Sequence, residues 1–179
     1  MPRLLVLMTG LLVSAAPAFA PALALDMPTR KAGLWELKMV FEGRNLPDQV
    51  MKQCVDAATD KLMNANFGGS NEQACSKQDV TKSAGTLTID SVCTFGGAVS
   101  TSHAVITGSF DSAYTMEVAT KREGASPAGQ RAYGETHMKI EAKWLGACAA
   151  GQKPGDVIMS NGMTMNVLDM QKMRGAPRR

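Results

Sequence analysis

Apolar and polar side chains alternate with a period of two along most of the chain, a pattern typical of half-buried β-strands. In segment 33–43, every second side chain is large and apolar: Trp35, Leu37, Met39 and Phe41. Segment 131–145 repeats the pattern, with Met138, Ile140, Ala142 and Trp144 alternating with charged residues. The same alternation predicts strands over 75–82, 86–93, 98–107 and 113–121.

Turn signals separate these strands. Ser83–Gly85 is predicted to be a three-residue hairpin loop, 108–112 a turn, and 122–130 a loop rich in small residues. Segment 55–66 has helical character, with Asp56 placed to cap the helix. Near the end, segment 159–173 is ambiguous between an amphipathic helix and a hairpin. Asn161-Gly162 lies between two short apolar runs, which favours the hairpin, followed by a short helical turn over 167–173.

Closely spaced strands with turns between them predict a mainly β fold. We expect an antiparallel sheet that forms a sandwich or a partly open barrel, with one short helix and two disulfides. Residues 25–173 would form this single domain, and residues 174–179 would form a solvated basic tail.

The N-terminus is predicted to be a secretory signal peptide. A short basic start is followed by an apolar stretch over 4–20 that contains no charged residue. Cleavage after Ala20 would leave Pro21 at the new N-terminus, so cleavage after Ala24 is favoured and the mature chain begins at Leu25. An uncleaved N-terminal anchor is the alternative. Export would place the protein in the periplasm or outside the cell.

Export predicts that the four cysteines form two disulfides, because an oxidising compartment favours disulfides. They are Cys54, Cys75, Cys93 and Cys148, and no Cys-x-x-Cys motif occurs among them. If Lys82 faces Thr86 across the hairpin, Cys75 lies directly opposite Cys93, where a bridge can form. We therefore predict Cys75–Cys93, which leaves Cys54–Cys148. A one-residue slip in the turn would weaken this assignment.

Charge excludes some functions. The chain has 19 basic and 16 acidic side chains, which gives a net charge of +3. One of the basic residues, Arg3, lies in the leader. This small and dispersed excess does not indicate binding to nucleic acid or to an anionic membrane.

A set of motifs in a fixed order adds a family resemblance. Residues 31–36 (KAGLWE) open the domain, the spaced cysteines follow, and 146–148 (GAC) and 153–156 (KPGD) close it. From about Lys31 to Asn166, the chain resembles the bacterial exported family catalogued as domain of unknown function 3617. Ala32 departs from the proline that is common there. The resemblance implies a small periplasmic or secreted β-rich domain, and it implies no activity.

Catalytic candidates are few, because the chain has only two histidines. His103 follows two serines and a threonine, but no nucleophile elbow or oxyanion motif accompanies it. His137 shares a strand face with Glu135 and Glu141 without a closed set of metal ligands. An envelope hydrolase that uses His103 or His137 is therefore an alternative, and a solvated role for both histidines is favoured.

Methionines are frequent, with 13 in the chain and several near its end. Met163 and Met165 would point the same way from one strand and could offer two thioethers to Cu(I). Periplasmic copper binding is thus a second alternative. Packing in the core is favoured, because no histidine or cysteine interleaves with these methionines.

The favoured function is a non-catalytic binding or envelope-structural module without a cofactor. A half-closed antiparallel sheet can hold a small apolar ligand or an envelope partner, and methionine side chains suit adaptable contacts. The residues predicted to line such a pocket are Met39, Phe41, Tyr114 and Met138.

Overall fold

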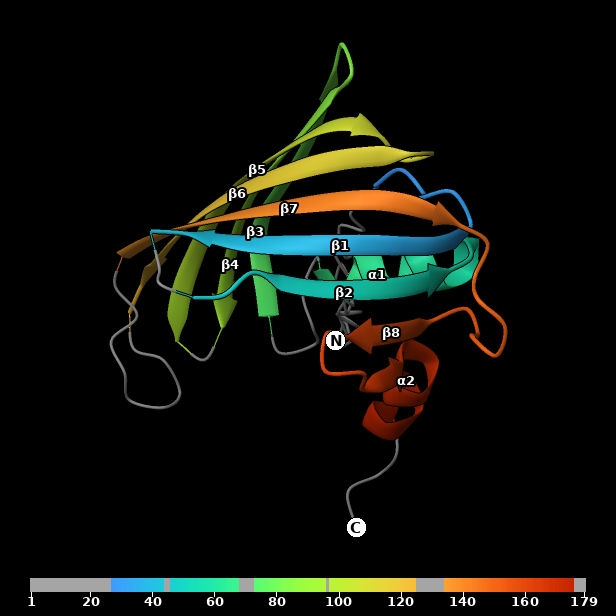
Figure 1. The fold of residues 1–179 in the computed structure, drawn as a ribbon. Helices are drawn as coiled ribbons and strands as arrows, with labels where there is room; N and C mark the ends of the chain where they lie inside the picture. The colour runs from blue at the N-terminus through green and yellow to red at the C-terminus, as the bar shows by residue number, and fades with distance from the viewer. Residues whose placement is uncertain (1–26, 44–45, 68–72, 96, 125–133, 176–179) are drawn as a thin grey trace, which may run out of the picture.

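A single antiparallel β-sheet of nine strands dominates the structure (Figure 1). The computed structural model describes residues 27–43, 46–67, 73–95, 97–124 and 134–175. The leader prediction and most of the predicted 122–130 loop lie outside these residues. Across the sheet, the strands follow the order β3-β4-β5-β6-β7-β1-β2-β8-β9.

Nine strands and two helices make up the described chain. The strands are β1 (Gly33–Glu42), β2 (Gln49–Val55), β3 (Gln73–Ser83), β4 (Thr86–Phe95), β5 (Ala98–Ser109), β6 (Ala113–Glu123), β7 (Gly134–Gly146), β8 (Asp156–Met159) and β9 (Thr164–Asn166). The helices are α1 (Ala57–Phe67) and α2 (Val167–Gly175). The prediction of a mainly β, antiparallel fold is confirmed: of its two forms, the sheet is open and not a sandwich, and the helical turn predicted over 167–173 is the second helix, α2.

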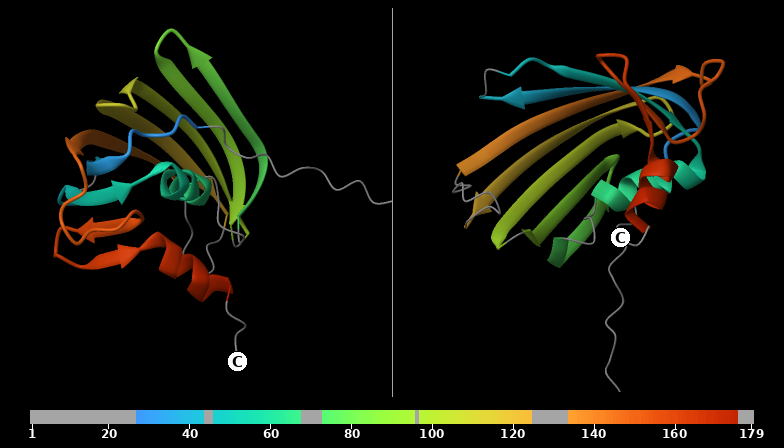
Figure 2. Two further views of the ribbon diagram at one scale, coloured as in Figure 1. Left: turned by 90° about the vertical axis from the view of Figure 1, so that its right-hand side faces the viewer. Right: turned by 90° about the horizontal axis from the view of Figure 1, so that it is seen from below.

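The sheet is strongly curved, and α1 lies on its concave side (Figure 2). Strands β3 to β7 form a meander, and β1 joins it by pairing with β7 on one side and with β2 on the other. Helix α1 follows β2 in the chain and precedes β3, which lies at the far edge of the sheet. Because β2 and β3 are far apart in the sheet, the chain between them crosses from one to the other, and α1 forms part of this crossing on the concave face.

The first turn of α1 is fixed by reciprocal capping. The Thr59 amide donates to Asp56 Oδ1 at 2.8 Å, and the Asp56 amide donates to Thr59 Oγ1 at 3.0 Å. This arrangement satisfies helix N–H groups that would otherwise lack partners. The hydrogen bond from the Thr59 backbone, followed by that from its side chain, lowers the pKa of the Asp56 carboxyl. The capping role predicted for Asp56 is confirmed.

Strand β2 was not predicted, and the predicted helix start at Val55 was two residues early. Along β2, Val50 and Met51 are adjacent, as are Cys54 and Val55, so the sequence lacks a period of two. The strand exists because it pairs with both β1 and β8. Tertiary pairing therefore overrides a weak local signal.

The β3–β4 hairpin corrects the predicted turn. Its loop has two residues, Ala84 and Gly85, both with positive φ, and Ser83 pairs with Thr86. This register alone would place Cys75 one residue away from Cys93. A β-bulge between Cys75 and Lys77 adds the missing residue and restores the Cys75–Cys93 pair.

Both predicted disulfides are present. Cys75–Cys93 joins β3 to β4 within the hairpin, and Cys54–Cys148 ties the end of β2 to the segment after β7. Their sequence separations are 18 and 94 residues. The second bridge thus connects residues that are far apart in the chain.

The core lies between the concave face and the helices, and Trp35 is at its centre. Trp35 is fully buried, its Nε1 donates to the Lys31 carbonyl at 2.8 Å, and its ring packs against that of Tyr114. Two residues before Trp35, Gly33 has a φ of +134°, and a Cβ there would collide with the Gly146 carbonyl oxygen. The motif over 31–36 therefore combines a close backbone approach with a large buried side chain.

The C-terminal segment forms the hairpin that the Asn161-Gly162 pair predicted. Strands β8 and β9 pair over Asp156–Asn166, Gly162 has positive φ, and α2 begins directly afterwards. Figure 1 shows α2 next to β8 at the end of the chain. Within the described ranges, no helix is long and apolar enough to cross a membrane.

Candidate functional site

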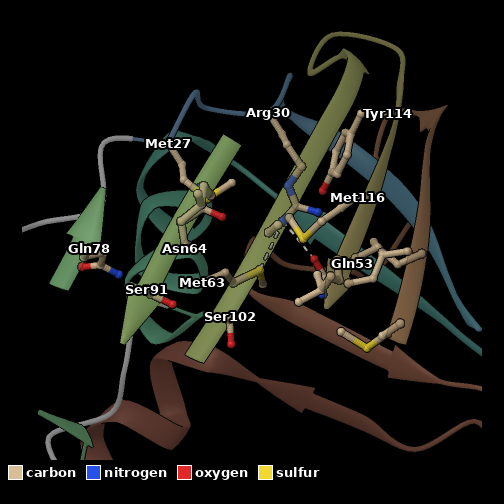
Figure 3. A pocket seen from close by; sticks show the side chains of 16 residues that line it. Met27, Arg30, Gln53, Met63, Asn64, Gln78, Ser91, Ser102, Tyr114 and Met116 are labelled. Atoms are coloured by element: carbon tan, nitrogen blue, oxygen red, sulfur yellow. Dashed lines mark hydrogen bonds between the residues drawn. The ribbon is translucent and has the colours of Figure 1, made fainter. Parts of the chain in front are cut away.

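A cavity of about 190 Å³ lies between the concave face of the sheet, α1 and the N-terminal segment (Figure 3). We call it the central cavity. Its described lining residues come from the N-terminal segment, from α1 and from seven strands: Met27, Arg30, Leu37, Gln53, Met63, Asn64, Gln78, Ile89, Ser91, Ser102, Ala104, Tyr114, Met116, Val118, Met138 and Ile140. It is somewhat larger than the apolar cavities of about 150 Å³ that hold benzene.

The wall of the cavity is mostly apolar because of strand alternation. Ala104 on β5, Val118 on β6 and Ile140 on β7 all point to the concave face, while their sequence neighbours point to the convex face. Four methionines, at 27, 63, 116 and 138, contribute flexible thioether chains. Such a surface can adapt to ligands of different shape.

One charged residue lies in this wall among the described lining residues: Arg30. It is only 5% exposed, although it precedes the first strand and looks like a surface residue in the sequence. Its Nε donates to Asp60 Oδ1 at 2.6 Å, and its backbone N–H donates to Asp60 Oδ2 at 2.8 Å. Asp60 lies on α1 and is fully buried, so this ion pair joins the N-terminal segment to the helix.

The rest of the guanidinium is only partly satisfied. Nη2 donates to Gln53 Oε1 at 2.9 Å and contacts Met63 Sδ at 3.6 Å. Nη1 is buried and has no hydrogen-bond partner among the described residues. An unpaired buried donor costs free energy, about 1–3 kcal/mol and more when the group is charged. Arg30 thus lines the cavity with a rigidly held guanidinium, of which one nitrogen is left without a partner among the described residues.

Tyr114 accompanies this donor. It comes from β6, and its hydroxyl end points toward the Arg30 guanidinium (Figure 3). Burial, helped by the negative charge of Asp60, raises the pKa of the Tyr114 hydroxyl, while the positive charge of Arg30 and its side-chain interaction with the hydroxyl oppose the rise. The hydroxyl consequently remains protonated at neutral pH and can act as a second donor.

Of the four residues predicted to hold an apolar ligand, two lie in the wall of the cavity, and their role in binding stays a prediction. Tyr114 and Met138 line the central cavity. Met39 packs against the core cluster and Phe41 lies opposite Met138 across β1 and β7, but neither lines the cavity. Arg30, Gln53 and Asp60 were missed. The only available signal was an acidic residue, Asp60, one helical turn before Met63 and Asn64 on the same side of α1.

The two histidines lie on the convex face. His103 Nδ1 is 2.7 Å from Asp90 Oδ1, and His137 Nε2 is 3.4 Å from Glu135 Oε1, with all four side chains about half exposed. Strand alternation points Ser100 and Ser102 to the opposite face from His103. These serines therefore do not complete a triad with the His103–Asp90 pair. No group of three or more His, Cys, Asp or Glu side chains suited to a metal ion occurs in the described parts of the chain.

The methionines of the copper hypothesis are at the surface. Met163 follows the β8–β9 turn and is 53% exposed, and Met165 on β9 is 37% exposed. In contrast, Met51, Met159 and Met170 are partly buried against the core. Core packing thus accounts for several methionines, and copper binding by Met163 and Met165 stays a prediction from sequence.

Comparison with known proteins gives one match. A family model described as "Protein of unknown function (DUF3617)" matches residues 30–148. No curated protein and no solved structure matches the chain. The matched region begins at Arg30, ends at Cys148 and includes every described lining residue of the central cavity except Met27.

Proposed function

Since this chain belongs to the DUF3617 family, whose description assigns no activity, its function must come from its own site, and we propose that it is a non-catalytic binding module. Its ligand would be a small apolar molecule, or an apolar part of an envelope component, held in the central cavity. The observation that carries this proposal is a mostly apolar cavity of about 190 Å³ with a few convergent polar groups.

Burial of apolar surface would supply most of the affinity. A ligand in the cavity would contact Ile89, Ala104, Val118 and the methionine side chains, and each methylene removed from water contributes about 0.8 kcal/mol. The methionines can change rotamer to fit the ligand at low cost. No catalytic group is required for this function.

A larger side chain inside the cavity should weaken ligand binding. We expect Ala104→Phe to weaken binding of n-propylbenzene at least tenfold, because the new ring would occupy the space that the ligand needs. Val105→Phe is the matched control, since the neighbouring side chain points to the convex face. Titration calorimetry or NMR titration measures both affinities, and thermal melting checks that each variant is folded. Equal affinities for both variants and the unchanged protein would refute the proposal.

We also propose that the protein works in the periplasm or outside the cell. The predicted leader over 1–24 and the two disulfides support this location, because disulfides persist in oxidising compartments. Intact-mass measurement of the exported protein should give a chain that begins at Leu25 and carries no free thiol. Accumulation only in the cytoplasm would contradict this location, and an exported chain that retains residues 1–24 would contradict the predicted cleavage.

A further inference from the structure

The structure also indicates what kind of polar group the ligand carries. We infer that the central cavity selects apolar molecules that bear one uncharged carbonyl group, such as an ester, whose oxygen accepts hydrogen bonds from Arg30 Nη1 and the Tyr114 hydroxyl. This inference rests on the proposed function, because it requires that the cavity holds a ligand.

The first reason is the unpaired donor. Arg30 is nine-tenths or more buried, its guanidinium is fixed by Asp60 and Gln53, and Nη1 remains without a partner among the described residues. An acceptor on the ligand would satisfy this group. A hydrocarbon of the same shape would leave it unsatisfied, so the cavity should discriminate between the two.

The second reason is charge balance. Arg30 is already neutralised by Asp60, whose Oδ1 and Oδ2 both accept hydrogen bonds from it. The described lining residues include no other cation. A ligand carboxylate would therefore bring an uncompensated negative charge into a buried site close to Asp60, which is costly. An ester or amide oxygen accepts the same hydrogen bonds without adding a charge.

The third reason is geometry. Tyr114 approaches the guanidinium from β6, while Gln53 on β2 accepts from Nη2, so the two donors, Nη1 and the Tyr114 hydroxyl, lie at one end of the cavity (Figure 3). Met116 contributes a thioether to the wall near this end, and the amide of Asn64 is already engaged with Asp60 Oδ2 at 3.3 Å. A polar atom of the ligand at this end would meet both donors, while the polar side chains Gln78, Ser91 and Ser102 lie elsewhere in the lining (Figure 3).

Three probes of similar size test the inference on the full mature protein: methyl benzoate, benzoate and n-propylbenzene. We expect methyl benzoate to bind about tenfold more tightly than n-propylbenzene, and benzoate to bind most weakly at neutral pH. Titration calorimetry or NMR titration gives the three dissociation constants. The ratio of the ester and hydrocarbon constants is the decisive quantity, because effects common to both ligands cancel.

Two variants test which groups produce the preference. Arg30→Lys keeps a cation beside Asp60 but loses the planar guanidinium, and Tyr114→Phe keeps the ring but loses the hydroxyl. Each should reduce the ester-to-hydrocarbon ratio several-fold while n-propylbenzene still binds. Because Tyr114→Phe removes a single oxygen, it tests the inference even if Arg30→Lys does not fold.

The outcomes separate the inference from the proposed function. If none of the three probes binds, the proposed function fails. The inference fails if n-propylbenzene binds as tightly as the ester and neither variant changes the ratio of the two dissociation constants. Nη1 would then be hydrogen-bonded to water and not to the ligand, and the proposed function would stand. Tightest binding of benzoate would show that the site accepts an anion and would equally overturn the inference.

Discussion

Replacing Cys54 and Cys148 together by serine is expected to lower the free energy of unfolding by about 4–5 kcal/mol. The bridge joins residues 94 positions apart, so its loss frees a long loop in the unfolded chain. It also releases β2 from the segment after β7, and Cys54 is fully buried at that contact. Since whole domains are stable by only about 5–15 kcal/mol, this loss is a large part of the total stability.

Removal of the other bridge is the matched comparison. Cys75 and Cys93 are 18 positions apart, so the chain-entropy model gives about 3 kcal/mol for the double serine variant. Urea denaturation of both variants under identical conditions measures the difference. If the Cys75→Ser/Cys93→Ser variant lost as much stability or more, loop length would not be the main source of stabilisation in this fold.

Asp60→Ala is expected to destabilise the protein by about 3–5 kcal/mol, because it leaves the buried Arg30 charge without its partner. The same change removes the acceptor of the Arg30 backbone N–H, so the N-terminal segment loses its attachment to α1. Chemical denaturation, followed by circular dichroism, measures the effect.

Two carboxylates provide controls for this prediction. Asp169 pairs with Lys172 on the surface of α2, so Asp169→Ala should cost at most about 1 kcal/mol. Asp56 caps α1 without pairing with a buried charge, and Asp56→Ala should cost about 1 kcal/mol. Replacement of the whole pair, as Arg30→Met with Asp60→Leu, should recover much of the stability lost in Asp60→Ala. A loss below 1 kcal/mol in Asp60→Ala would show that the buried pair is dispensable.

The Cys75–Cys93 bridge shows how a correct conclusion can rest on a partly wrong element. The sequence predicted a three-residue loop, which places Cys75 opposite Cys93. The loop has two residues, and the bulge near Ser76 compensates for the difference. Alternation of side chains does not reveal a bulge, because a single extra residue is a local irregularity that depends on the partner strand.

The candidate site shows a sharper limit of sequence reasoning. Tyr114 and Met138 could be placed on the inward side of the sheet because they lie on apolar faces of regular strands. Arg30 lies before the first strand, and nothing in its neighbourhood distinguishes it from a solvated basic residue. Its burial depends on Asp60, which is 30 residues later, and on Gln53 in a strand that the sequence did not predict.

By itself, the sequence determined the regular part of this protein: most strands, their inward faces, the capped helix and both disulfides. These features follow from periodicity and short-range turn chemistry, which each segment carries within itself. Only the tertiary structure decided that the sheet stays open and curved, that α1 lies in its hollow, and that Arg30 is buried with one nitrogen unpaired. These features arise from contacts between segments far apart in the chain, and a local pattern contains no information about which partner a charged side chain will meet.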